Sequence, residues 1–162
     1  MDQDILFKTD GLIFSYRGGG IAIRGGHVLL QRPKNDDFAV IGGHVRGMET
    51  GEEALKREFL EELHAQIEVN RLIAAGEIFF PWNGMPCHQI CLYYDISLQG
   101  SGVPEEGSFS GYDELGNERT DLDFIWVSLE DLRKGTVMYP KELVPYILEP
   151  QKEIVHFVSR YL

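Results

Sequence analysis

The chain of 162 residues has little positive charge, little cysteine and no long apolar run. Its 15 Lys and Arg are outnumbered by 26 Asp and Glu, which gives a formal net charge of −11. Duplex nucleic acid is normally bound by a basic face, and membranes by a polybasic anchor, so both partners are excluded. No apolar run approaches the roughly 18–20 residues of a membrane helix.

Two cysteines, Cys87 and Cys91, are too few for a disulfide framework. His88 lies between them, but zinc sites usually collect four ligands, and the sequence has no second cysteine pair. We interpret both as free thiols in a reducing compartment. The first residues, MDQDILFKTDG, lack the basic and apolar regions of a signal peptide, so a cytoplasmic location is expected.

The length predicts a single domain over residues 1–162. Short β-rich runs come first, and Gly25 and Gly26 form a predicted hairpin turn between two of them, because tight turns need positive φ. The triplet 18–20 is expected to separate two further runs. The predicted strands are 12–17, 21–24, 28–32, 38–41, 67–72, 74–80, 89–97 and 124–127.

A helix is predicted after Thr50, over the segment GEEALKREFLEELH. Thr50 and Glu53 have the spacing of a capping box. At 100° per residue, Leu55, Phe59 and Leu63 share one face.

Residues 99–118 are rich in Gly, Ser and acidic side chains and are predicted to form a long loop. Ser128 is expected to open a short helix, and 141–148 and 152–161 have a helical period. Strands, one central helix, more strands and terminal helices predict an α/β layered domain with a mixed sheet.

Glu58, Glu61 and Glu62 fall together on the central helix, beside its apolar face. The helix also follows a double-glycine turn that leaves backbone carbonyls accessible. Clustered carboxylates with a carbonyl suit a hard cation such as Mg²⁺ or Mn²⁺, which would let an acidic protein hold a phosphate anion. A solvated acidic face is the alternative.

The segment GHVRGMETGEEALKREFLEELHA, residues 43–65, resembles the Nudix box, G-x₅-E-x₇-R-E-U-x-E-E-x-G-U, where U is a bulky aliphatic residue. The matching positions are Gly43, Glu49, Arg57, Glu58, Phe59, Glu61 and Glu62. His64 and Ala65 replace the final glycine and aliphatic residue, which puts the C-terminal cap of the helix in question. Weaker likeness to the family covers 21–32 and 124–132.

The resemblance implies an α/β/α sandwich and hydrolysis of a nucleoside diphosphate linked to another moiety. It implies that Glu58, Glu61 and Glu62 ligate Mg²⁺ or Mn²⁺ together with the carbonyl of Gly42. It also implies a pair between Arg57 and Glu49 that holds the loop against the helix.

The general base is open between a glutamate of the box and an acidic residue of the later loop, Glu118, Glu114 or Asp113. Arg32 is a candidate phosphate contact and equally a surface arginine. Phe80 is a candidate for stacking on a base, as are Phe79, Trp82 and Tyr112, although aromatic residues in strands more often belong to the core.

A nucleotide-binding or regulatory domain without catalysis is a second reading, since fold alone does not give function. An isomerase that uses Cys87 or Cys91 with a glutamate is a third. The substrate is open among ADP-ribose, other nucleotide sugars, dinucleoside polyphosphates and oxidised nucleoside triphosphates. Both a monomer and a homodimer are compatible with the sequence.

Overall fold

The computed structural model describes residues 2–32, 37–100, 102–115 and 118–162, and only the backbone of 112–115 and 118–120. Strands make up most of the chain. In chain order the elements are β1 (Leu6–Lys8), β2 (Ile13–Arg24), β3 (His27–Arg32), β4 (Phe38–His44), α1 (Gly51–Leu63), β5 (Gln66–Trp82), β6 (Met85–Gln99), β7 (Ser108–Leu115), β8 (Glu118–Ser128), α2 (Leu129–Arg133), β9 (Met138–Tyr139), η1 (Lys141–Leu143), α3 (Val144–Leu148) and β10 (Val155–Arg160).

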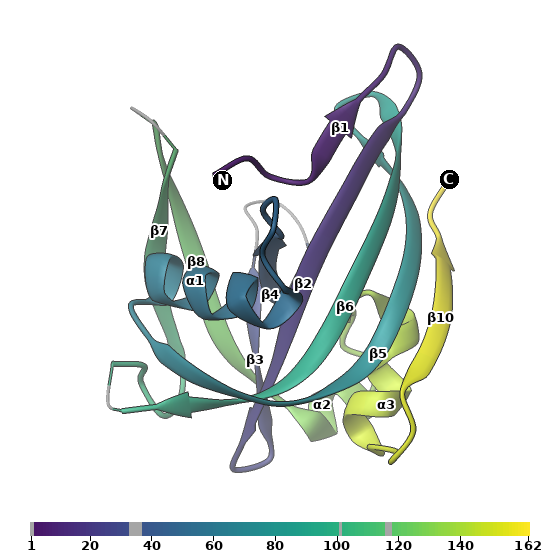
Figure 1. The fold of residues 1–162 in the computed structure, drawn as a ribbon. Coiled ribbons are helices and arrows are strands. Elements are labelled where there is room, and N and C mark those ends of the chain that lie inside the picture. Colours follow the sequence, from purple (N-terminus) through teal and green to yellow (C-terminus); the bar gives the residue numbers. More distant parts are fainter. Residues whose placement is uncertain (1, 33–36, 101, 116–117) are drawn as a thin grey trace.

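The described strands form one mixed sheet in the order β10-β5-β6-β2-β4-β3-β8-β7, with β1 added to β2 and β9 to β4. The pairs β2–β6, β5–β10 and β4–β9 are parallel, and the other pairs are antiparallel. Figure 1 shows the long strands β2, β5 and β6 curving together, with α1 lying across the sheet. None of the helices in the described ranges is long and apolar enough to cross a bilayer.

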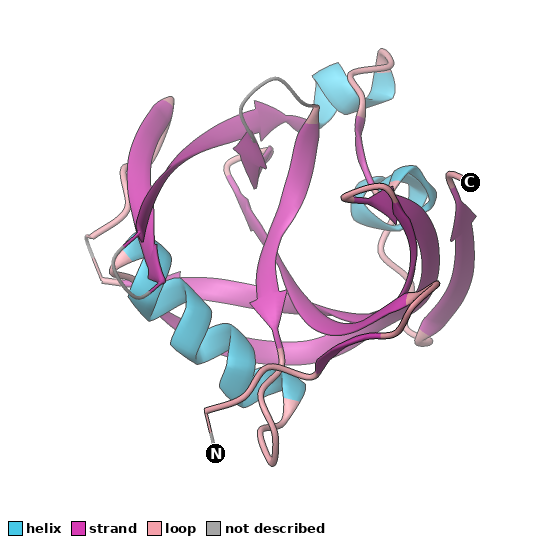
Figure 2. Ribbon diagram, turned by 90° about the horizontal axis from the view of Figure 1, so that it is seen from above, coloured by secondary structure: helices cyan, strands magenta, loops and turns pink. Residues whose placement is uncertain are grey.

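The core lies on both faces of the sheet. Ala22 packs with Phe59 of α1, whereas its neighbour Ile21 belongs to the cluster that contains Ile147 of α3. Successive strand residues point to opposite faces, so α1 and α3 cover opposite sides. Figure 2 shows α1 on one side and the shorter helices on the other. The predicted α/β/α arrangement around a mixed sheet is therefore confirmed.

The central helix is confirmed as predicted. The Glu53 backbone N–H donates to Thr50 Oγ1 at 3.2 Å, and the Thr50 backbone N–H donates to Glu53 Oε2 at 2.8 Å, which completes the capping box. Leu55 and Phe59 are fully buried and Leu63 is 5 % exposed. The apolar face therefore fixes α1 on the sheet and sets the direction of its carboxylates.

The predicted break at residues 18–20 is wrong, because β2 continues through the three glycines. A Cβ atom at Gly19 would lie 2.6 Å from Cδ1 of Tyr93, and one at Gly20 would lie 2.9 Å from Cδ1 of Ile96. Glycine serves close packing here and not a turn. The hairpin turn at Gly25 and Gly26 is confirmed, with φ of 56° and 75°.

Two other expectations are wrong. The predicted loop over 99–118 contains β7, which pairs with β8 and whose Phe109 ring lies 5.4 Å from that of Phe124. The predicted helix over 152–161 is β10, in which Phe157 and Ser159 are buried and Val158 between them is exposed. In both segments the extended conformation is set by pairing with a neighbouring strand and not by local propensity. The predicted strands 67–72 and 74–80 are one strand, β5, with register shifts near the expected break.

His64 closes α1 in the left-handed conformation, with φ 54° and ψ 33°. It thus takes the cap conformation that glycine adopts without cost, in the way expected of an improvised cap. For a residue with a Cβ atom this conformation costs roughly 1–2 kcal/mol.

We predict that His64→Gly is more stable than His64→Ala by about 1 kcal/mol, because both remove the imidazole and only glycine relieves the left-handed strain. Urea unfolding followed by circular dichroism measures the difference. Equal stabilities of the two variants would contradict a left-handed cap.

Candidate metal and active site

The loop between β4 and α1 is held by one glutamate. The Arg46 backbone N–H donates to Glu49 Oε1 at 2.9 Å, and the Glu49 backbone N–H donates to the Arg46 carbonyl at 3.0 Å. Met48, between them, has a φ of 68° and is 91 % exposed. The loop thus turns sharply and presents the Glu49 carboxylate to α1.

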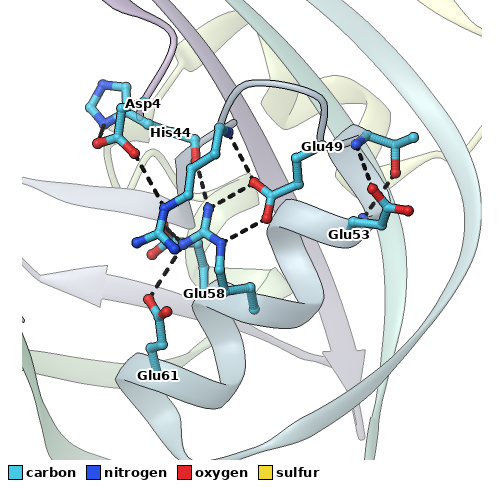
Figure 3. A network of polar contacts seen from close by, with 9 residues as sticks. Asp4, His44, Glu49, Glu53, Glu58 and Glu61 are labelled. Carbon is cyan, nitrogen blue, oxygen red and sulfur yellow. Dashed lines mark hydrogen bonds and ion pairs between the residues drawn. The ribbon is translucent and has the colours of Figure 1, made fainter. Parts of the chain in front are cut away.

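Arg57 of α1 joins this loop, the end of β4 and the acidic helix face. Figure 3 shows the labelled side chains of Glu49, Glu58 and Glu61 gathered along this helix face. Its Nε and Nη2 donate to both oxygens of Glu49 at 2.8 and 2.9 Å, and Nη2 also donates to the His44 carbonyl at 2.9 Å. Its Nη1 donates to Glu58 at 2.8 Å and to Glu61 at 3.3 Å. The predicted pair of Arg57 with Glu49 is thus present as a fork-to-carboxylate contact.

The pKa values of Glu49 and Glu58, the two carboxylates closest to the Arg57 guanidinium, shift in opposite directions. The hydrogen bonds from Arg57 hold the pKa of Glu49 below its usual range. Burial raises the pKa of Glu58, with Arg57 opposing the rise. Glu49 therefore gives a stable structural ion pair, whereas the charge on Glu58 is costly without further positive charge beside it.

Glycine lets the Glu58 carboxylate lie against the end of β4. A Cβ atom at Gly43 would lie 2.2 Å from Cδ of Glu58. Glu62 is only 6 % exposed, and its backbone carbonyl lies 2.3 Å from the position a Cβ of Gly111 would take. Glu58 is thus packed against β4 and the backbone of Glu62 against β7, whereas Glu61 stays exposed.

The donor chemistry at this place suits a hard divalent cation. Glu58, Glu61 and Glu62 supply carboxylate oxygens and Gly42 a backbone carbonyl, which are the ligands that Mg²⁺ and Mn²⁺ prefer. In the described part of the chain, no three His, Cys, Asp or Glu side chains are already arranged around a common metal position. Arg57 Nη1 instead holds Glu58 and Glu61, so a cation there requires these carboxylates to turn.

A cavity of about 540 Å³ adjoins Gly42, lined by β2, β4, β5, β6 and β9 and by Tyr161. Arg17 projects into it and donates from Nη2 to the Gly42 carbonyl at 3.2 Å. Among the described residues no carboxylate forms an ion pair with Arg17. Burial and the charge of Arg17 lower the pKa of the nearby His44 to about 4, so that imidazole is neutral at pH 7.

The structure separates the two residues predicted to bind substrate. Phe80 lines the cavity with Arg17. Arg32 lines a second cavity of about 300 Å³ with residues of β7 and β8, and its guanidinium lies 5.4 Å from the Phe38 ring centroid. Arg17 was missed by sequence reasoning, although an arginine directly before a glycine run was a usable signal.

Several candidates lie outside the described side chains or away from the cavity. Glu118 begins β8, but its side chain, like those of Tyr112, Asp113 and Glu114, is outside the described part. Phe79 points to the opposite face, where its ring lies 4.6 Å from that of His88. Trp82 stacks on His44 and Phe80.

Both cysteines are buried free thiols, as expected. Burial raises the pKa of Cys91 to about 11, so this thiol stays protonated at neutral pH. It therefore lacks the acidity that the isomerase reading requires.

The chain belongs to the Nudix family, since the family's model, described as NUDIX domain, matches residues 17–147. The predicted class, a Nudix-type hydrolase, is therefore confirmed at the level of the family. Comparison of the sequence with curated proteins gives no match.

Solved structures show the same fold at low sequence identity. A NUDIX hydrolase from Nitrosomonas europaea has a TM-score of 0.59 at 16 % identity, over 90 % of this chain and 77 % of the other. A MutT protein from Methanosarcina mazei Go1 has 0.60 at 17 %, over 90 % and 100 %. An ADP-ribose pyrophosphatase from Streptococcus suis has 0.56 at 14 %, over 90 % and 98 %.

We predict that Arg57→Lys lowers the free energy of unfolding by about 2 kcal/mol, because an ammonium cannot replace the fork that holds Glu49 and the His44 carbonyl. Urea unfolding gives the value. Arg133→Lys is the matched control, because its pair with Glu130 at 3.4 Å is exposed and should change stability by less than about 0.5 kcal/mol. Equal effects of the two changes would contradict the role given to Arg57.

Proposed function

We propose that the protein hydrolyses a pyrophosphate bond in a nucleoside diphosphate linked to another moiety, with Mg²⁺ or Mn²⁺ as cofactor. The observation that carries the proposal is the position of Gly42 and Gly43. Gly42 lines the cavity and accepts from Arg17, while Gly43 leaves room for the Glu58 carboxylate. The cavity and the Glu58 carboxylate thus adjoin neighbouring residues of β4, so a substrate in the cavity would bring its pyrophosphate to this end of β4.

The carboxylates of Glu58, Glu61 and Glu62 and the carbonyl of Gly42 would hold the cation. A divalent cation at such a site supplies positive charge that offsets the charge of the pyrophosphate and activates water for attack. Arg57 and Glu49 hold the loop against the helix, which keeps the acidic face of α1 beside the end of β4. They act through position and not through contact with substrate.

Two groups are candidates for the general base. One is a glutamate of α1, and the other is Glu118 at the start of β8. Burial raises the pKa of Glu58, which is the direction that strengthens a carboxylate as a base and favours the helix.

The cavity provides space for the nucleoside part of the substrate, because clefts of roughly 300–1,000 Å³ hold small-molecule ligands. Arg17 would contact a phosphate, since a half-buried guanidinium with no carboxylate partner in the described ranges favours an anion. An ADP-ribose pyrophosphatase and a UDP-X diphosphatase have similar structures, which supports this substrate class. ADP-ribose, other nucleotide sugars, dinucleoside polyphosphates and oxidised nucleotides all stay within the proposal. We expect a cytoplasmic monomer or homodimer.

A domain that binds nucleotides without hydrolysis is the second candidate. The contact of Arg57 Nη1 with Glu58 and Glu61 favours it, because this guanidinium already neutralises two of the proposed ligands. Phosphate release from the four substrate classes, with and without Mg²⁺ or Mn²⁺, decides between binding and hydrolysis.

We predict that Glu62→Gln lowers Mg²⁺-dependent turnover by roughly a hundredfold or more, since even the outer partners of metal ligands are worth about 10–100-fold. Glu52→Gln is the control, an exposed carboxylate in the first turn of the same helix. Calorimetric titration with Mn²⁺ should show weaker binding to the Glu62 variant alone. Turnover of folded Glu62→Gln near that of the wild type would remove Glu62 from the site.

The two arginines can be compared directly. We predict that Arg17→Ala raises KM about tenfold with a smaller change in kcat, because a charge-assisted hydrogen bond to phosphate contributes about 1.5–3 kcal/mol. Arg32→Ala, measured beside it, should have the smaller effect because Arg32 lies in the other cavity. If KM rises more in Arg32→Ala than in Arg17→Ala, the phosphate contact is Arg32 and not Arg17.

A further inference from the structure

The wall of the cavity carries one buried amide with a fixed orientation. Gln89 of β6 is 7 % exposed and lines the cavity. Ser15 of β2, its partner in the parallel pair, is fully buried, and its hydroxyl donates to Gln89 Oε1 at 3.3 Å. Because the amide oxygen is turned to Ser15, the amide nitrogen with its two N–H donors is the part left for a ligand.

Gln89 stands beside the proposed phosphate contact. Arg17 and Cys91 form the next row on the same face of the β2–β6 pair, two residues along each strand. Two strand residues span about 6.5 Å. A ligand whose phosphate meets Arg17 can therefore extend along the strands to the amide of Gln89.

The other walls suit a flat ring. Phe80, Tyr93 and Tyr139, from three different strands, line the same cavity. Aromatic side chains stack on nucleobases, and this contact does not distinguish one base from another. Asp37 also lines the cavity but is exposed, so its carboxylate contributes less to selection than a buried group.

We propose that Gln89, oriented by Ser15, selects nucleotides whose base presents a carbonyl oxygen to its N–H donors. Guanine and uracil carry a carbonyl at the position where adenine and cytosine carry an amino group. An amino group facing the Gln89 N–H donors leaves donors on both sides unpaired, which is costly in a buried site. The inference rests on the proposed function, because it concerns the nucleoside end of the same substrate.

The test compares four substrates that differ only in the base: GDP-glucose, UDP-glucose, ADP-glucose and CDP-glucose, with Mg²⁺. The wild type should show kcat/KM about tenfold higher for the guanine and uracil substrates. Gln89→Met, which has no donor, should lose this preference, and Gln89→Glu, an acceptor, should reverse it. Ser15→Ala should weaken the preference while Gln89 is retained, because the amide is then free to turn.

Gln99→Met is the matched control, with the same change at an exposed position near the end of the same strand. Binding of GMP, UMP, AMP and CMP by calorimetry gives a second readout that is independent of turnover. In the wild type, GMP and UMP should bind more tightly than AMP and CMP. This comparison needs no variant, so it tests the inference even if a Gln89 variant does not fold.

A wild type that shows no base preference or prefers adenine and cytosine would overturn the inference, as would a preference that survives in folded Gln89→Met. In those cases hydrolysis itself is intact, so the proposed function stands. If none of the four nucleotide sugars is cleaved and none of the four monophosphates binds, the inference fails, whereas the proposed function fails only if all four substrate classes stay uncleaved with Mg²⁺ and Mn²⁺.

Discussion

The candidate site depends on the guanidinium of Arg57. One side chain ties the loop through Glu49, the end of β4 through the His44 carbonyl, and the acidic face of α1 through Glu58. The loop, the strand β4 and the helix α1 are thereby held in a fixed position relative to one another. The loop buries Val45 but exposes Met48, so the ion pair adds a second attachment to the packing of Val45.

This arrangement explains why an acidic protein can be suited to an anionic ligand. The net charge of −11 repels phosphate at long range. Locally, Arg17 projects into the cavity. With the proposed divalent cation held by the carboxylates of α1, positive charge would gather where the pyrophosphate is proposed to lie. The same geometry separates two tasks, since α1 would carry the chemistry and the cavity the recognition.

The sequence predicted the site better than it predicted the sheet. The capping box at Thr50 and the apolar face of α1 follow from spacing within one helix, and the Arg57–Glu49 pair follows from the resemblance to the Nudix box. Each is present. The strands β7 and β10 were missed, because their conformation is set by pairing with β8 and β5 and not by local propensity. Arg17 and Gln89 were missed for the same reason, because only the parallel pairing of β2 with β6 brings them to one wall.

The most direct test of the account follows the pyrophosphate bond itself. The four substrate classes are incubated with the protein in ¹⁸O-labelled water and followed by ³¹P nuclear magnetic resonance, with Mg²⁺, with Mn²⁺ and with chelator. The account predicts that the pyrophosphate resonances of at least one class disappear only with metal, and that ¹⁸O enters one of the two phosphate products. Unchanged pyrophosphate resonances for every class in Mg²⁺ and in Mn²⁺, with nucleotide binding intact, would contradict hydrolysis and leave a binding domain.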